Sequence, residues 1–384
     1  MAAAAPERMA LWLELLNEAI AGESRRQGVR VHLGQSTGLL AQRVTENASR
    51  TGEHYITSSR EEYFSMWRAA MGAGFIVGFM ALIKLYLGKL ALAPLGFALA
   101  YSLNYAGGFI LVHVLHFTIA TKQPAMTAAT IAGAISGIRA SARDLEKLAT
   151  LVVDLVRSQL AAILGNVGIA LPTAMAIAWG MGLALGRPFI DADKARHLLH
   201  DISPFESLAL LHAAIAGVWL FLSGLVSGYY DNLAAYERVR ERIVHARWLR
   251  SLLGESRQLR FAAYAHDNLG ALAGNLFFGF ALGTTATVGM LTGLPLDIRH
   301  VTFASANFGF ALVALDFSVD GWTVLKSLAG IGLVGMVNLT VSFTLALWLA
   351  LRARGAGFRQ TRALAGLLVQ RWRANYRQFF WPTR

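Results

Sequence analysis

The sequence contains no cysteine and little charge. None of its 384 residues is Cys, which excludes disulfides, thiolate nucleophiles and cysteine-ligated metal or iron–sulfur sites. Only 15% of the residues are Asp, Glu, Lys or Arg, whereas a soluble domain has about 25%. The hydrophobic share is 55% and the mean hydropathy is +0.47. This composition excludes an ordinary soluble domain and indicates a membrane protein.

Charge is also missing from long stretches of the chain. Residues 90–121 form a run of 32 residues without Asp, Glu, Lys or Arg, which exceeds the roughly 20 residues that cross a bilayer. We therefore predict an all-α fold, a polytopic transmembrane helical bundle of about six spans. Similar uncharged windows place these spans at about 66–87, 91–120, 159–186, 204–229, 269–293 and 324–352.

Two further apolar windows are too short to cross. Residues 123–138 begin next to Pro124, and residues 300–317 are closed by Asp316 and Asp320. If 300–317 crossed the membrane, the Arg-rich C-terminus would lie on the wrong side. We predict that both are re-entrant or broken elements, which survive only where protein or a water-filled cavity satisfies their backbone groups.

The distribution of Lys and Arg predicts the orientation. Residues 121–158 carry five of them, residues 230–268 carry seven, and residues 352–384 carry eight Arg and no acid. Residues 1–66 do not show the pattern of a secretory signal. By the positive-inside rule we expect both termini in the cytoplasm. The predicted organisation is a cytoplasmic helical segment at 1–65, a transmembrane domain at 66–352 and a tail at 353–384.

The tail is expected to form a basic amphipathic helix. Leu364, Leu367, Leu368, Trp372, Tyr376 and Phe379 recur at spacings of three and four, and Arg359, Arg362, Arg371, Arg373 and Arg377 fall largely off that face. We expect these arginines to contact anionic phospholipid headgroups of the bilayer. Docking against the N-terminal segment and contact with nucleic acid are the alternatives.

Four asparagines share a local pattern inside the apolar windows. Asn166, Asn275 and Asn307 each follow a small residue and precede an apolar one, and Asn338 stands between Val337 and Leu339. This repetition is typical of the duplicated half-sites of transporters. Hydrogen bonding between helices explains it as well.

The longest window carries its own polar residues. Asn104, His113 and His116 precede Lys122, and two histidines three apart share one face of a helix. The pair is a candidate for a proton relay, a metal pair or a substrate contact, or for simple hydrogen bonds to backbone.

A second histidine cluster lies between the third and fourth spans. His197, His200 and Asp201 form an H-x-x-H-D pattern with weak metal-binding character, although a solvated loop accounts for it equally well. We therefore predict neither a metal site nor a cofactor.

Four passages resemble a bacterial family of the Gcr type that is named site-specific recombinase. They are Gly52–Ile56, Asn104–Phe109, His116–Met126 and Asp297–Phe303, and the residues from Thr121 to Ala128 are the most specific. The resemblance covers the chain from about residue 50 onward, and members usually have a longer soluble N-terminal region. It implies a bacterial inner-membrane location and, by the family's name, a role in DNA recombination.

The residues themselves do not show recombinase chemistry. His245-Ala246-Arg247 lacks the H-x-x-R spacing of tyrosine recombinases, and Ser58-Ser59-Arg60 lies in no α/β domain. The sequence also contains no P-loop, H-E-x-x-H or G-x-S-x-G. No catalytic residue is therefore predicted.

Two classes of function stand. The first is a transporter, channel or membrane scaffold with a polar intramembrane site, and the second is a membrane-associated DNA recombination factor. Convergence of Asn104, Asn166, Asn275, Asn307 and Lys122 on one cavity would favour the first. A single broad basic face would favour the second, and either class allows a homo-oligomer.

Overall fold

The computed structural model describes residues 9, 12–18, 56–119, 142–353 and 359–382. These residues form helices, turns and connecting loops, without a strand in the described ranges. The all-α prediction is confirmed. The predicted re-entrant element at 123–138, Lys122 and most of the N-terminal segment 1–65 lie outside the described residues.

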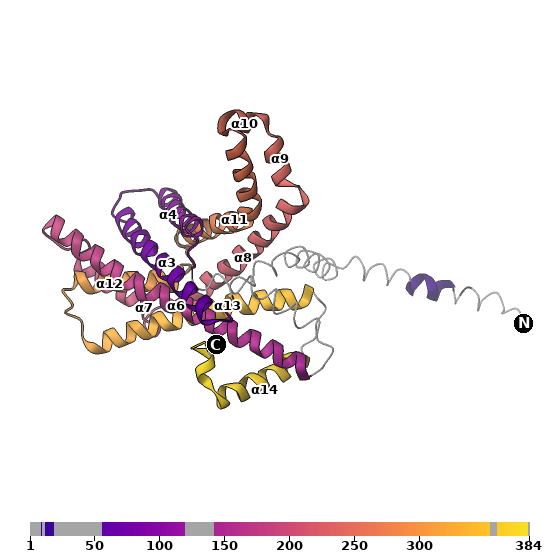
Figure 1. Cartoon of the computed structure of the whole chain (residues 1–384). Coiled ribbons are helices and arrows are strands. Elements are labelled where there is room, and N and C mark those ends of the chain that lie inside the picture. The colour runs from indigo at the N-terminus through magenta and orange to yellow at the C-terminus, as the bar shows by residue number, and fades with distance from the viewer. Residues whose placement is uncertain (1–8, 10–11, 19–55, 120–141, 354–358, 383–384) are drawn as a thin grey trace, which may run out of the picture.

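Six helices in the described chain are long and apolar enough to cross a membrane (Figure 1). The shortest has 21 residues, about 31 Å, which matches a hydrocarbon core about 30 Å thick. The predicted helical bundle of six spans is confirmed. The helices are α3 (Arg60–Leu87), α4 (Pro94–Val114), α6 (Ala142–Leu185), α8 (Ala209–Tyr236), α11 (Glu255–Thr292) and α13 (Gly321–Ala353).

Several helices extend beyond their uncharged windows because polar turns continue the helix outside the apolar stretch. The residues from Ala142 to Ser158 add such an extension to α6, and the residues from Glu255 to Asn268 add one to α11. In contrast, α4 ends at Val114, before the end of its window. Charge-free length therefore locates a span better than it locates the ends of its helix.

Small residues allow the spans to approach closely. A Cβ added to Gly279 of α11 would lie 2.3 Å from the backbone nitrogen of Ala106 in α4, and one added to Gly283 would lie 2.3 Å from that of Ser102. These positions explain why α4 packs closely along α11. The other main helix pairs are α3 with α6, α8 with α11, and α8 with α13.

The helix α12 (Val301–Ala314) is the predicted short element. Its 14 residues span about 21 Å, too little to cross a bilayer. It lies in the interior of the bundle against α6 and α7 (Ala192–Ile202), and its residues 301–306 are all buried. Its first residue contacts Asn338, in the middle of α13, while its last residue leads by a short turn to the start of α13. The first turns of α12 therefore lie inside the bundle, and a re-entrant path of this segment in the membrane stays a prediction.

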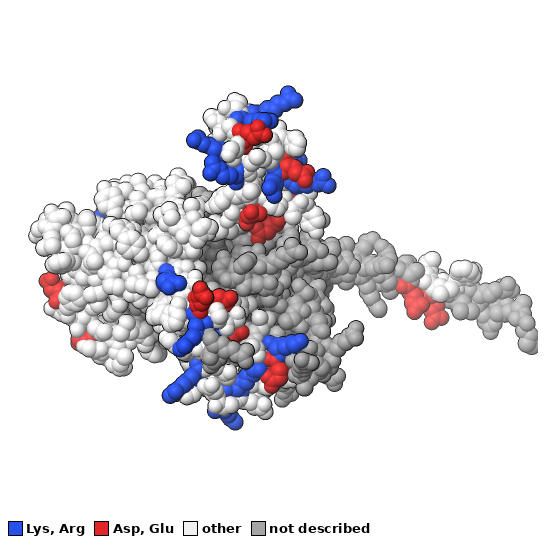
Figure 2. Space-filling view, in the orientation of Figure 1, with Lys and Arg blue, Asp and Glu red and all other residues white. Residues whose placement is uncertain are grey.

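Two short helices, α9 (Val239–His245) and α10 (Arg247–Leu253), connect α8 to α11 and project as a tip from the bundle (Figure 1). Figure 2 shows Lys and Arg side chains on this tip and around the C-terminal helix, while the left part of the bundle carries little charge. Among the described residues on this face, basic side chains gather in these two places.

The tail forms α14 (Arg359–Ala374) and a 3₁₀ turn, η1 (Tyr376–Phe379). The predicted basic amphipathic helix is confirmed, and its apolar face packs on protein: Leu364 is buried with Leu148 and Leu155 of α6. The hydroxyl of Tyr63, in α3, donates to the carbonyl of Phe380 at 3.2 Å. The tail is thus attached to α3 and α6.

The basic residues of the tail have different surroundings. Arg371 pairs with the carboxylate of Glu146 and donates to the hydroxyl of Thr150 at 3.0 Å. Arg373 and Arg377 are exposed. The side chains of Arg359 and Arg362 lie outside the described residues. Of the predicted lipid contacts, Arg371 is therefore engaged by α6.

Candidate functional site

The predicted asparagines act mainly as links between helices. The Nδ2 of Asn166, in α6, donates to the carbonyls of Ala70 (2.8 Å) and Thr118 (2.9 Å), and its Oδ1 accepts from the Thr302 hydroxyl at 3.3 Å. The Nδ2 of Asn104, in α4, donates to the carbonyl of Met80 in α3 at 2.9 Å. For these two residues the structure shows the interhelical hydrogen bonds that were one of the alternatives.

Asn338 makes three hydrogen bonds that link the start of α12 and the loop before it to α8. Its Oδ1 accepts from the backbone N–H of Val301 at 3.1 Å, and its Nδ2 donates to the carbonyls of Ala213 (2.8 Å) and Arg299 (3.0 Å). His300, which is 1% exposed, caps the same helix by accepting from the Thr302 N–H at 3.4 Å. These bonds satisfy backbone groups that the re-entrant element would otherwise leave free inside the bundle.

Within the described residues, the asparagines do not converge on the charged cavity described below. Asn275 is buried in α11 next to Gly274, where α11 packs on Ser227 of α8. Asn307 is half-buried in α12 and lines the cavity described below. Among the five residues named for the convergence test, only Asn307 lines this cavity, and Lys122 lies outside the described chain.

The two histidines of α4 do not share a helical face. His113 lies in the last turn, and its Nε2 is 2.9 Å from Oδ1 of Asn268 in α11. His116 follows the helix end, is exposed and has φ 56°, a left-handed conformation that terminates the helix. The prediction of a pair on one face is wrong because the helix ends between the two residues.

A charged cavity of about 470 Å³ lies among α3, α7, α12 and the loop 293–300. Its volume falls within the range of about 300–1,000 Å³ that is usual for small-molecule sites. Its walls come from the last turn of α3, from Tyr101 of α4, from α7, and from Asn307 and the first turn of α12. The charged residues that line it are Lys84, Lys89, Lys194, Arg299, Asp191, Asp201 and Asp297.

Arg299 organises one wall of this cavity. Its guanidinium lies 2.9 Å from Oδ1 of Asp201 in α7 and 2.5 Å from Oδ2 of Asp297, and its Nε donates to the Asp201 carbonyl at 3.0 Å. Its side chain is only 12% exposed, so this is a largely desolvated cation held by two carboxylates. The network ties the loop before α12 to α7.

An ion pair outside the cavity lining holds the connection that follows α7. The Lys326 ammonium, near the start of α13, lies 2.6 Å from Oε1 of Glu206. Hydrogen bonding and charge from Lys326 lower the pKa of the exposed Glu206 carboxyl below its ordinary value. The turn between α7 and α8 is thereby held against α13.

The H-x-x-H-D pattern belongs to the same region. Nδ1 of His197 is 3.2 Å from Oδ2 of Asp201, whose other oxygen serves Arg299, while His200 is exposed. Within the described residues no group of three or more His, Cys, Asp or Glu side chains could hold a metal ion. His197 and Asp201 therefore act as a polar wall around Arg299.

Lys84 forms the opposite wall. It lies in the last turn of α3, and its Nζ is 5.9 Å from the ring centroid of Tyr101 and 5.7 Å from that of Tyr105. At these distances an ammonium interacts favourably with the π faces. Lys89, two residues after α3, donates instead to the carbonyl of Phe189 and lies 3.9 Å above the ring of that residue.

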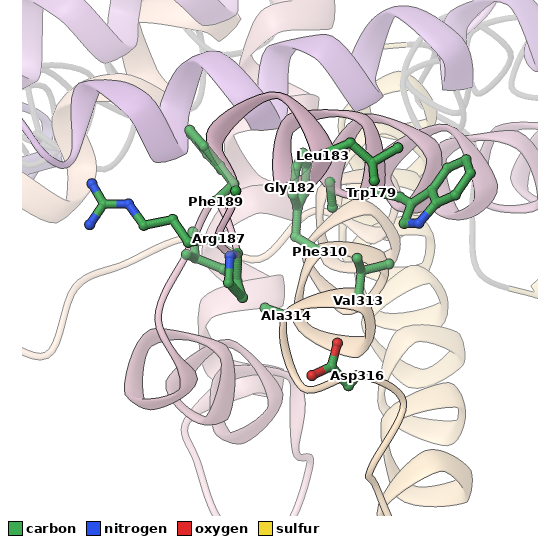
Figure 3. A pocket seen from close by; sticks show the side chains of 13 residues that line it. Trp179, Gly182, Leu183, Arg187, Phe189, Phe310, Val313, Ala314 and Asp316 are labelled. Atoms are coloured by element: carbon green, nitrogen blue, oxygen red, sulfur yellow. The ribbon is translucent and has the colours of Figure 1, made fainter.

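A smaller hollow of about 250 Å³ lies beside this cavity (Figure 3). It is formed between the end of α6, at Trp179 and Leu183, and the end of α12, at Phe310 and Val313. Its lining is mostly apolar, and Arg187 and Asp316 contribute the charged groups. Phe189 and Ile190 line this hollow, and Ile190 also lines the charged cavity, so the two are neighbours.

Sequence reasoning missed the charged wall of the main cavity. Lys84 and Lys89 lie between the first two charge-free windows, and Asp297 and Arg299 lie between α11 and α12. In the sequence each is therefore interpreted as a charge in a loop or at the membrane interface. The Asp297–Phe303 passage had been singled out, but only for its resemblance to a family. A cluster of acidic and basic residues directly before the predicted re-entrant element is the sequence signal that could have identified this wall.

A family model described as site-specific recombinase matches residues 1–382 of the chain. This range includes all four passages on which the resemblance was based. No curated protein and no solved structure matches the chain.

Proposed function

The chain belongs to the site-specific recombinase family, and from its structure we propose that it is a membrane transport protein that binds a small polar solute in the charged cavity. The observation that carries the proposal is the charged cavity beside a re-entrant helix. Concave sites with a few converging polar and charged groups are where small solutes usually bind.

The re-entrant helix supports this proposal. Transporters commonly place their sites where a broken helix ends inside the bundle, because the helix dipole there faces the solute. Here the first turn of α12 borders the cavity through His300 and Phe303. The same turn is held in place by Asn166 and Asn338.

The orientation is part of the proposal. The excess of Lys and Arg at 121–158, 230–268 and 352–384 supports a cytoplasmic position for those segments, with the protein in a bacterial inner membrane. The cavity then opens on the opposite side, since it is lined by the end of α3 and by α7.

The α9–α10 tip would then contact the inner leaflet. Trp248 and Leu252 are 71% and 72% exposed there, beside Arg247 and Arg250. Exposed aromatic and aliphatic side chains among arginines suit an interface with anionic phospholipid headgroups.

The DNA role implied by the family's name has the same tip as its support, because arginines also bind phosphate backbones. Acidic residues reduce its charge, however: Arg242 lies 3.0 Å from Glu237, and Arg250 pairs with Glu255. The lipid assignment is therefore favoured. If purified protein binds duplex DNA weakly, independently of sequence and with a steep salt dependence, arginines meeting phosphate suffice as the explanation.

A blocked cavity tests the solute-binding proposal. Ala286 is exposed and lines the cavity, so Ala286→Trp should fill part of it without disturbing the core. Val288 is 45% exposed on the same helix and does not line the cavity, which makes Val288→Trp the matched control.

The measurement is the thermal unfolding midpoint of purified protein with panels of sugars, amino acids, organic acids, inorganic phosphate and organic cations. A bound solute should raise the midpoint for the wild type and for Val288→Trp, but not for Ala286→Trp. Uptake of that solute into proteoliposomes then tests transport. A wild-type protein that responds to no solute class would contradict the proposal.

A further inference from the structure

The end of the tail forms an aromatic cluster with much of its surface exposed. The ring centroid of Trp372 lies 6.3 Å from that of Tyr376 and 5.7 Å from that of Phe380. The exposed fractions range from 46% to 53% for Trp372, Tyr376, Phe380 and Trp381. Since Leu364, on the apolar face of α14, is buried against α6, these rings form the exposed apolar surface of the tail.

An open hollow of about 580 Å³ lies among these side chains and is lined by residues 375–377 and 380–382. Arg377 is the charged residue of this lining. Within the described residues, Arg377 and the nearby Arg373 pair with no carboxylate, in contrast to Arg371, which pairs with Glu146. The hollow therefore combines aromatic walls with a guanidinium whose charge is not neutralised by a direct contact.

Hydrogen bonds from two spans hold the walls of the hollow in place. The Tyr63 hydroxyl, in α3, donates to the carbonyl of Phe380 at 3.2 Å, and Nη1 of Arg157, in α6, donates to that of Gln378 at 3.3 Å. The side chain of Gln378 donates to the carbonyl of Arg371 at 3.2 Å, which ties η1 to α14. A site that is held in this way loses little conformational freedom when a ligand binds.

The aromatic cluster continues onto the first turns of α3. The ring centroid of Trp381 lies 5.7 Å from that of Tyr63 and 5.6 Å from that of Phe64. The ring of Phe64 lies 6.1 Å from that of Trp67, which is 36% exposed. Because α3 is long and apolar enough to cross a membrane, these rings belong to the end of a span. Aromatic side chains at such ends usually lie at the depth of the lipid headgroups.

We propose that this hollow binds an anionic phospholipid, with its phosphate against Arg377 and its glycerol and acyl groups along the aromatic walls. Arginine binds phosphate through paired hydrogen bonds, and aromatic rings suit the boundary between headgroups and acyl chains. Residues 352–384 carry eight Arg and no acid, so the surrounding charge also attracts a negative headgroup.

This inference goes beyond the proposed function. The hollow is next to the first turns of α3, whereas the charged cavity is lined by the last turn of that helix, and the two share no lining residue. Binding of the lipid therefore requires no transported solute. It would attach the tail to the bilayer at the point where α3 enters it.

The form of the hollow favours a lipid over a soluble phosphate. A small soluble anion would contact Arg377 but would leave the rings of Tyr376, Phe380 and Trp381 uncovered. A phospholipid contacts both the guanidinium and the rings, and the exposed Trp67 continues the aromatic surface along α3. Burial of this apolar surface adds to the attraction between the charges.

The inference is tested by adding phosphatidylglycerol or phosphatidylcholine to full-length protein in detergent. Native mass spectrometry counts the bound lipid, and the thermal unfolding midpoint reports its effect on stability. Phosphatidylglycerol should stay bound and raise the midpoint, phosphatidylcholine should do so much less, and soluble glycerol 3-phosphate should have no effect. Arg377→Gln should raise the apparent dissociation constant of phosphatidylglycerol at least about fivefold.

Arg373→Gln is the matched control for this variant. It removes the same charge from an exposed residue of the same tail, but Arg373 does not line the hollow, so binding should stay as in the wild type. Neither arginine side chain makes a hydrogen bond or an ion pair within the described residues, so both variants should fold as the wild type does. Arg377→Lys keeps the charge without the paired geometry and should weaken binding less than Arg377→Gln.

Three outcomes would overturn the inference. Equal weakening by Arg373→Gln and Arg377→Gln would show only a general attraction between the basic tail and negative lipids. Phosphatidylglycerol binding that Arg377→Gln leaves unchanged would place the lipid elsewhere on the protein. A midpoint that glycerol 3-phosphate raises as much as phosphatidylglycerol does would assign the hollow to a soluble phosphate. None of these outcomes affects the proposed binding of a solute in the charged cavity.

Discussion

The side chain of Asn338, in the middle of α13, accepts a hydrogen bond from the backbone N–H of Val301, the first residue of α12, at 3.1 Å. Its Nδ2 binds the carbonyl of Arg299 in the loop before α12 and that of Ala213 in α8. One amide group therefore fixes the re-entrant element to two spans. The Arg299 side chain, which forms a wall of the cavity, depends on the same loop.

Replacement of Asn338 by Leu should destabilise the protein. The substitution leaves a buried N–H and two carbonyls without their partner, and a buried unpaired polar group costs about 1–3 kcal/mol. We expect a lower midpoint of thermal unfolding in detergent. The control is Asn104→Leu, which removes one bond, to Met80, and should cost less. Equal losses in the two variants would contradict the role assigned to Asn338.

A glycine pair tests the packing of α4 on α11. Gly279→Ala should destabilise the protein by about 1–3 kcal/mol, because the new methyl group would lie 2.3 Å from the backbone nitrogen of Ala106 and the helices would have to separate. Gly107→Ala is the matched control: nothing lies within 4 Å of its Cβ position, so the better helix propensity of Ala should make it neutral or slightly stabilising. Unfolding midpoints measured in one detergent compare the two, and a harmless Gly279→Ala would refute this helix contact.

The fold could be predicted from the sequence to a large extent because lipid imposes a simple rule. Residues 90–121 and the other windows are free of charge because a span must be, and the 300–317 window, which Asp316 and Asp320 close, forms a helix too short to cross. Helix ends could not be read in this way. Polar turns such as Ala142–Ser158 continue α6 outside the apolar stretch, and His116 ends α4 through its own backbone conformation.

The candidate site was much less predictable. Polar residues within apolar windows attracted attention, but Asn104, Asn166 and Asn338 make contacts between helices. Lys84 and Arg299 stand at window edges, where a charge is ordinary in any membrane protein. Only the way in which the loop 293–300 enters the bundle brings them to one cavity, and this path depends on tertiary contacts that a hydropathy pattern does not contain.

The proposed orientation can be tested by labelling, since the chain lacks cysteine. Single cysteines at Asp193, Ser251 and Gln370 would occupy exposed positions on α7, α10 and α14. An impermeant thiol reagent added to intact cells should label position 193 only. Labelling of all three after the membrane is opened is the control for reactivity. Labelling at 251 or 370 in intact cells would overturn the orientation.

Arg299→Met should show how much the ion pairs of the cavity wall contribute to the stability of the protein. The variant leaves Asp201 and Asp297 without their shared cation, and removing one partner of a buried ion pair costs about 3–5 kcal/mol. The two carboxylates are 26% and 33% exposed, so solvent screening should reduce the loss to about 2 kcal/mol.

The double variant Arg299→Met with Asp297→Asn tests the electrostatic origin of this loss. Removing one uncompensated carboxylate should recover part of the stability, whereas Asp297→Asn alone should lower it because Arg299 then loses a partner. The four proteins form a double-mutant cycle that is read from their unfolding midpoints. Additive losses would show that the two side chains do not interact. A double variant less destabilised than the sum of the two single losses would show that the paired charges stabilise the loop 293–300.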